Sequence, residues 1–123
     1  MDIRLLYPSE FLAAVDLHGK DATLTIRRVI TEDLKTNKGS EKKPVVYFEE
    51  TKARAEKSGA KEKRLVLNKT NALVIAKIYG YEADDWRGKR ITLYPTTCDA
   101  FGEQKDCIRV RPTAPPPAPT TET

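Results

Sequence analysis

The sequence predicts a mainly β domain, a five-stranded barrel with one helix between the third and fourth strands. Short runs of alternating, β-branched residues recur along the chain. One run with helical spacing stands between the third and the fourth of them. The chain has 123 residues, 39% of them hydrophobic, which suffices for one core but not for two. We expect this domain to span residues 1–111.

The first two strands are expected at 22–30 and 45–50. In the first, Leu24 and Ile26 alternate with polar residues, so the two sets lie on opposite faces. The second reads VVYFEE, and Pro44 before it suits the start of a strand. The stretch between them is polar and contains a glycine, as expected for a connection.

The third strand is expected to be short and the loop before it long. Residues 51–63 are polar, basic and rich in alanine, which we interpret as a flexible loop, and the extended pattern returns only at 64–67. Asn68 then suits the N-cap of a helix that ends at Gly80, with apolar residues at helical spacing between them. This is the one helix that we predict.

Two strands at 89–94 and 105–111 close the chain. Alternate residues of each are apolar, and the opposite set, which faces outward, is basic. Trp86, in the loop before them, suits a plug over one end of the core better than a stacking role. The order strand, strand, strand, helix, strand, strand is typical of the OB-fold, a five-stranded Greek-key barrel.

The last twelve residues, 112–123, are expected to form a disordered tail. They include five prolines and no apolar residue larger than alanine, so they cannot bury enough surface to offset the entropy of ordering.

No run approaches the roughly 18 apolar residues of a membrane span, and the N-terminus lacks the pattern of a secretory leader. We therefore expect a cytoplasmic protein that does not contact membranes.

The composition argues against catalysis and metal binding. One histidine and two cysteines are too few for the usual ligand set of a structural zinc ion. His18 lies in a predicted turn, and the pair Asp84 and Asp85 lacks a second acidic cluster for phosphodiester chemistry. Cys98 and Cys107 could approach each other across the last hairpin, although a reducing cytoplasm disfavours a disulfide. We expect no enzymatic activity, no metal and no cofactor.

Positive charge is concentrated in two stretches. Residues 52–69 hold seven basic and two acidic side chains, and residues 87–111 hold six and three, whereas the rest of the chain is net acidic. This distribution is typical of proteins that bind polyanions, because neutralising phosphates releases condensed counterions. A solvated, lysine-rich loop is the alternative interpretation.

Binding of single strands also needs rings on which bases stack. We expect Tyr47 to be exposed beside Arg27 and Arg64; the alternative packs Tyr47 inside and covers Phe48 with a loop. Tyr94 points outward by alternation but precedes a proline, at which a strand can end. The residues expected to bind nucleic acid are Arg27, Tyr47, Lys52, Arg54, Lys61, Lys63, Arg64, Tyr94, Arg109 and Arg111.

Most of the chain resembles small proteins encoded in tailed-phage and prophage genomes. The resemblance rests on LNKTNALVIAKIYG, then ADDWRGKRITLYPT, then DCIRVRP, and covers roughly residues 11–112. It implies a role on single-stranded DNA in phage or prophage replication or recombination, with proteins of those processes as partners. The matching positions, most of which suit caps, turns and packing, are Asn68, Thr70, Asn71, Trp86, Gly88 and Lys89.

Together, these features predict a non-catalytic protein that binds single-stranded DNA without strong sequence preference. The basic residues of the loop at 51–63 are expected to close over the bound strand. The alternative is an interaction module that docks on a host or phage protein through a sheet edge or the hairpin that carries Phe101. A nuclease accessory protein or inhibitor is a third candidate, because such proteins carry no motif of their own. The choice between DNA and RNA and the oligomeric state stay open.

Overall fold

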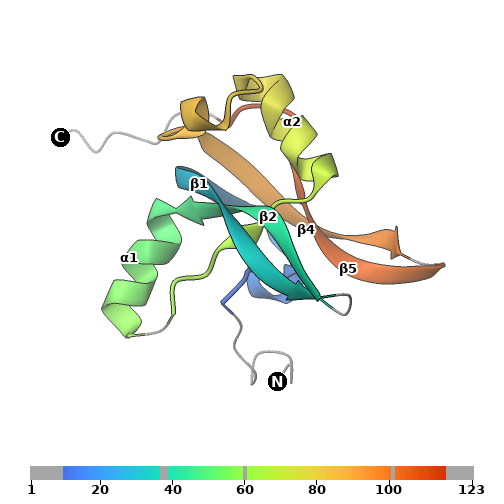
Figure 1. Cartoon of the computed structure of the whole chain (residues 1–123). Coiled ribbons are helices and arrows are strands. Elements are labelled where there is room, and N and C mark those ends of the chain that lie inside the picture. The colour runs from blue at the N-terminus through green and yellow to red at the C-terminus, as the bar shows by residue number, and fades with distance from the viewer. Residues whose placement is uncertain (1–9, 37–38, 60, 101, 116–123) are drawn as a thin grey trace.

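The computed structural model describes residues 10–36, 39–59, 61–100 and 102–115. Five strands make up its sheet: β1 (Ala22–Thr36), β2 (Gly39–Phe48), β3 (Leu65–Val66), β4 (Arg90–Ala100) and β5 (Glu103–Val110). Two α-helices and two short 3-10 helices complete the described part: α1 (Glu49–Ser58), α2 (Lys69–Tyr79), η2 (Ala14–Leu17) and η3 (Ala83–Trp86) (Figure 1).

All strand pairs are antiparallel, and the order across the sheet is β3-β2-β1-β4-β5. The expected mainly β class with five strands is therefore confirmed. The expected barrel is not confirmed, because β3 and β5 form the two edges of the sheet and do not pair with each other within the described residues.

β1 belongs to both halves of the sheet. Residues 22–25 pair with β4, whereas residues 26–36 pair with β2. The register shifts between Ile26 and Arg28, so Arg27 is the extra residue of a β-bulge. A bulge bends its strand and increases the local twist. The β1–β2 and β4–β5 hairpins consequently run at an angle to each other (Figure 1).

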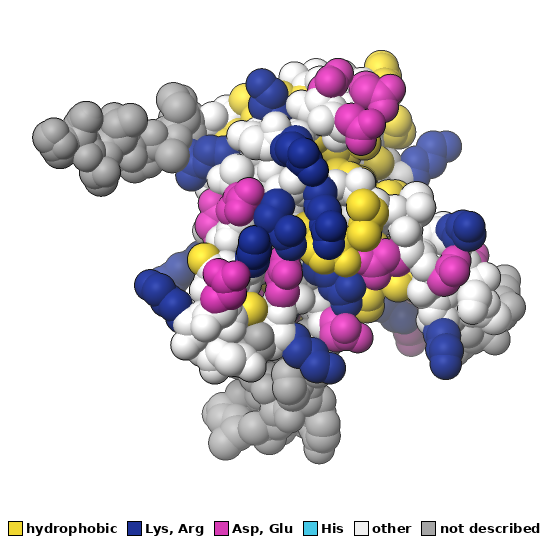
Figure 2. Space-filling view, turned by 60° about the vertical axis from the view of Figure 1, so that its left-hand side comes forward, with side chains coloured by type: hydrophobic (Ala, Val, Ile, Leu, Met, Phe, Trp, Pro, Cys, Tyr) yellow, Lys and Arg dark blue, Asp and Glu magenta, His cyan; other side chains and the backbone are white. Residues whose placement is uncertain are grey.

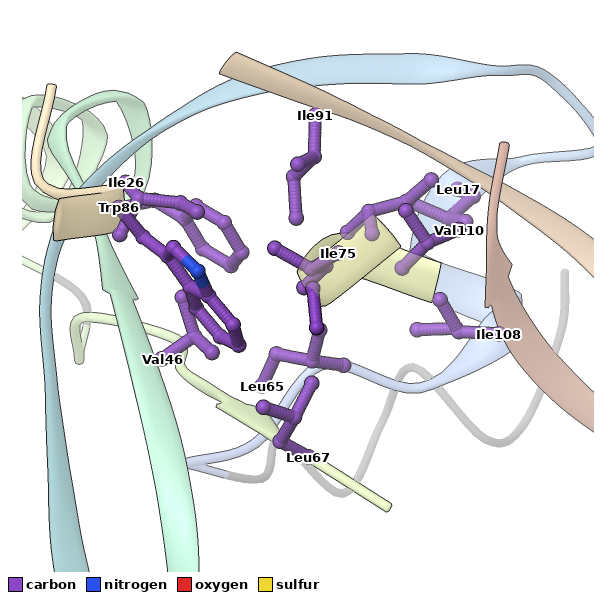
Figure 3. Packing of buried hydrophobic residues seen from close by; sticks show 13 residues of the cluster. Leu17, Ile26, Val46, Leu65, Leu67, Ile75, Trp86, Ile91, Ile108 and Val110 are labelled. Carbon is purple, nitrogen blue, oxygen red and sulfur yellow. The ribbon is translucent and has the colours of Figure 1, made fainter. Parts of the chain in front are cut away.

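The core lies between these two halves. Ile26 and Phe48 from one half and Ile91 and Leu93 from the other have no exposed surface. Ile75 of α2 is equally buried and packs in the same cluster, near the middle of Figure 3. Five large apolar side chains from both hairpins and the helix thus exclude water from one shared interior.

α2 covers one end of this core. The side chain of its N-cap, Asn68, accepts a hydrogen bond of 2.8 Å from the backbone N–H of Asn71, and Gly80 ends the helix, as the sequence predicts. The Asn71 side chain is buried and donates a hydrogen bond of 2.9 Å to the carbonyl oxygen of Ile108 in β5. Trp86 is buried in the core cluster, so it has the structural position that we expected.

The segment 10–17 bridges another part of the space between the edge strands. The N–H of Leu12 donates to the carbonyl oxygen of Arg64 at 2.7 Å, and the N–H of Arg64 donates to that of Glu10 at 3.0 Å, just before β3. η2 follows and packs against β4 and β5. This segment and α2 therefore connect β3 to β5 where strand pairing does not.

α1 corrects the prediction of a flexible loop at 51–63. Its residues are mostly alanine, lysine, glutamate and arginine, which are strong helix formers. The helix begins directly after β2, and its first turn is held to β1 by two hydrogen bonds. The backbone N–H and the hydroxyl of Thr25 donate to the carboxylate of Glu50 at 2.7 and 2.8 Å. Gly59, with a φ of 73°, ends the helix in the left-handed conformation.

β1, β2 and β4 also extend further than predicted, although β2 ends two residues earlier than expected, at Phe48. β1 and β2 continue as a polar hairpin in which Glu32 lies opposite Lys43 and Asp33 opposite Lys42, and such opposite charges stabilise cross-strand pairs. β4 does not end before Pro95 but continues to Ala100.

Of the predicted tail, residues 112–115 contain neither helix nor strand and the rest lies outside the described residues, as does Phe101. No helix in the described part is long and apolar enough to cross a membrane.

Candidate nucleic-acid interface

The face of the sheet that points away from the core carries both tyrosines selected from the sequence. Tyr47 lies opposite Arg28 in the β1–β2 ladder, and Tyr94 lies opposite Arg109 in the β4–β5 ladder. Their neighbours Phe48 and Leu93 belong to the core cluster. Since successive side chains of a strand point to opposite faces, both tyrosine rings lie on the outer face.

Tyr47 is buried on this outer face by arginine side chains. Only 8% of the residue is exposed. The guanidinium carbons of Arg28, Arg27 and Arg64 lie 4.4, 5.3 and 5.6 Å from the centre of its ring, within the range of cation–π attraction. Its hydroxyl donates a hydrogen bond to the carboxylate of Glu32. The prediction of an exposed ring is therefore wrong, although its position beside Arg27 and Arg64 is correct.

Two of these three arginines are neutralised by carboxylates. Arg27 pairs with Glu62, and Arg64 pairs at 3.1 Å with both Glu10 and Glu32. Burial by itself lowers the pKa of Arg64, but the hydrogen bond to Tyr47 and the nearby carboxylates outweigh burial and raise that pKa above its ordinary value. Arg27 and Arg64 are therefore held in place by fixed ion pairs.

Arg28 differs from its two neighbours. It is exposed, and it forms no ion pair with any residue of the described part. It lines a pocket of about 360 Å³ together with Val29, Ile30, Ala83, Asp84 and Arg87. The Nε of Arg87, also exposed, donates a hydrogen bond of 3.2 Å to the carbonyl oxygen of Arg27. Arg28 and Arg87 thus place two cations at one pocket. Among the described residues that line that pocket, Asp84 is the one acidic residue.

Tyr94 also carries an arginine, Arg111, over its ring. The guanidinium carbon of Arg111 lies 3.8 Å from the ring centre, and Tyr94 itself is partly exposed. Arg111 binds the carboxylate of Asp21 through two hydrogen bonds of 3.0 and 3.1 Å. This pairing lowers the pKa of Asp21 and raises that of Arg111. Arg109 lies opposite Tyr94 in β5 and is partly buried.

The basic residues expected on the loop occupy another part of the molecule. Lys52 and Arg54 are exposed on α1, and Lys61 and Lys63 follow that helix. Arg54, Lys61 and Lys63 line a pocket of about 410 Å³ between α1 and residues 12–18. There the Nζ of Lys63 binds a carboxylate oxygen of Asp16 at 2.7 Å.

The ten expected residues thus fall into three groups, around Tyr47, around Tyr94 and along α1. In Figure 2, Lys and Arg side chains gather at the centre of one face with Asp and Glu side chains among them, so this face is not uniformly positive. Sequence reasoning omitted Arg28 and Arg87. The signal available for Arg28 was its place in the basic pair Arg27-Arg28, but regular alternation places residue 28 on the face of Leu24 and Ile26, and only the bulge at Arg27 moves it to the outer face.

Comparison of the chain with protein-family models, curated proteins and solved structures gave no match. The phage or prophage origin therefore stays a prediction. Within the described ranges, no group of three or more His, Cys, Asp or Glu residues is placed to hold a metal ion. What the protein does must be inferred from the outer face of the sheet.

Proposed function

We propose that the protein binds single-stranded DNA, without catalysing a reaction, on the outer face of the sheet around Arg28 and Arg87. The observation that carries this proposal is the environment of Arg28. Its guanidinium is exposed, has no carboxylate partner in the described part and is supported by the ring of Tyr47 at 4.4 Å. A supported guanidinium offers a charge to a phosphate and a flat surface to a base.

The pocket beside Arg28 suits one base of such a strand. Its volume of about 360 Å³ falls at the lower end of ordinary small-ligand pockets. Exposed Ile30 gives it an apolar wall, and Arg87 places a second cation at its rim. A base could stack against Arg28 while the neighbouring phosphates contact both guanidinium groups.

The strand order supports an OB-fold opened between β3 and β5. That fold places a helix between its third and fourth strands and binds ligands on the face of strands two and three. Tyr47 and Arg64 lie on the corresponding face, formed here by β2 and the edge strand β3. The same fold also binds oligosaccharides, and the exposed arginines are what favours an anionic ligand.

Binding is expected to be weak and to involve few phosphates. Four of the expected cations, Arg27, Lys63, Arg64 and Arg111, already pair with carboxylates, with which a phosphate would have to compete. Two phosphate contacts, one each for Arg28 and Arg87, correspond to a slope of about −1.4 when log affinity is plotted against log salt, since each contact on a single strand contributes about −0.7. The resemblance to phage proteins supports a place in replication or recombination, in the bacterial cytoplasm and with proteins of those processes as partners.

Fluorescence anisotropy of a labelled oligothymidine tests this proposal. We expect binding that weakens about sevenfold when salt rises fourfold. Arg28→Glu and Arg87→Glu should each weaken oligothymidine binding relative to the wild type. Lys77→Glu on α2 is the control, because it makes the same charge change at an exposed position away from the pocket. Absence of binding at low salt, affinity independent of salt, or equal losses in all three variants would contradict the proposal.

A protein-docking module is the second candidate. The ion pairing of half of the expected cations favours it, as does β5, an edge strand whose residues 103–106 are exposed. An edge strand can accept a strand from a partner. Under this alternative, Arg28→Glu leaves capture of the partner intact, whereas Gln104→Pro abolishes it, because the N–H of Gln104 points to the free edge and not to β4.

A further inference from the structure

Cys98 of β4 and Cys107 of β5 are neighbours on one face of the last hairpin. The ladder sets Cys107 opposite Thr96 and Cys98 opposite Lys105, so the two cysteines are diagonal partners. Because alternate residues share a face, both side chains lie on the same side of the hairpin. Both thiols are free and partly buried.

The two thiols also interact. Burial, and to a smaller extent a hydrogen bond with Cys98, raise the pKa of the Cys107 thiol to about 11. Two pKa units reduce the thiolate fraction about a hundredfold at neutral pH, and only the thiolate is a nucleophile. Cys107 is therefore a poor first attacker of an external reagent, yet it lies beside the sulfur of Cys98.

We propose that Cys98 and Cys107 are a reversible covalent modification site, a dithiol that small-molecule disulfides such as oxidised glutathione convert into a cross-strand disulfide. The thiolate of Cys98 attacks one sulfur of the reagent, so a Cys98–glutathione bond forms, the reagent's S–S bond breaks and one glutathione thiolate leaves. Cys107 then loses its proton to solvent and attacks the Cys98 sulfur, which expels the second glutathione. The two protein thiols are oxidised, and one reagent disulfide is reduced to two thiols.

The bond would join the two strands near Arg109, two residues from Cys107, and Tyr94, four residues from Cys98, on the same face of the hairpin. It needs no bound nucleic acid, so this proposal does not depend on the function proposed above. The expected consequence is a hairpin whose backbone amides exchange more slowly with solvent in the oxidised protein than in the reduced protein.

Mass spectrometry of the full chain treated with oxidised glutathione tests this inference. The wild type should lose about 2 Da with no lasting adduct, and a reducing agent should restore the original mass. Cys107→Ser should keep one glutathione on Cys98. Cys98→Ser should react far more slowly, because burial, the larger cause of the raised pKa, still acts on Cys107.

Three results would overturn the inference. One is a wild type that accumulates glutathione adducts without an internal disulfide. Another is disulfide-linked dimers in place of the internal bond. The third is equal reaction rates for the two serine variants in the folded protein. Repeating the rates in urea gives the reference, since unfolding should make the two variants react alike.

Discussion

Asn71→Ala should destabilise the protein because it removes the buried link between α2 and β5. The Asn71 residue is 1% exposed, and its amide donates a hydrogen bond of 2.9 Å to the Ile108 carbonyl oxygen. Without that donor the buried carbonyl keeps only a long contact of 3.5 Å from Nη1 of Arg109, and a poorly satisfied buried acceptor costs about 1–3 kcal/mol. The space left by the shorter side chain adds about 0.7 kcal/mol if roughly 30 Å³ stays empty.

The sum, about 2–3.5 kcal/mol, is a large part of the usual 5–15 kcal/mol stability of a domain. Urea denaturation followed by Trp86 fluorescence should show the midpoint falling by about 1–2 M. Leu73→Ala is the matched control, because Leu73 lies on the same helix but is exposed. If the free energies of unfolding of the two variants agree within about 0.5 kcal/mol, the Asn71 contact does not stabilise the fold as argued.

Three further predictions concern other contacts. Trp86→Phe removes the donor to the Gly80 carbonyl oxygen and should cost about 1–3 kcal/mol in urea denaturation followed by circular dichroism; an unchanged midpoint would refute this role. Because Arg111 lowers the pKa of Asp21, their stabilisation should be present above the ordinary carboxyl pKa and disappear as pH falls through the lowered one. The melting temperatures of wild type and Arg111→Gln should therefore converge in acid, and a constant difference would contradict the pairing. Glu50→Ala should lower helical circular dichroism by releasing the start of α1; an unchanged spectrum would show that α1 does not need this anchor.

The sequence predicts best those elements that bury an apolar face. α2 combines a side-chain cap at Asn68, a glycine after its last residue and apolar residues at helical spacing, and all three survive in the structure. The central parts of the strands are predicted by the alternation of apolar and polar residues, because they too bury one apolar face. α1 was missed because no residue of it is buried, so its signal is helix propensity alone.

The candidate site was predicted less well because it depends on contacts between distant residues. A single bulge residue, Arg27, changes which side chains of β1 share a face with Tyr47. Long arginine side chains then cover the ring. The pairing of Arg64 with Glu32 joins residues 32 positions apart, and no local pattern reveals such pairs.

Nuclear magnetic resonance mapping of the oligothymidine site tests the central claim most directly. Addition of the oligonucleotide to the isotope-labelled protein should shift the resonances of Arg28, Arg87 and the β2 residues around Tyr47 most strongly. Resonances of α2 around Lys77 should stay in place. Shifts confined to α1 or to the β5 edge, or none at low salt, would contradict binding on the outer face.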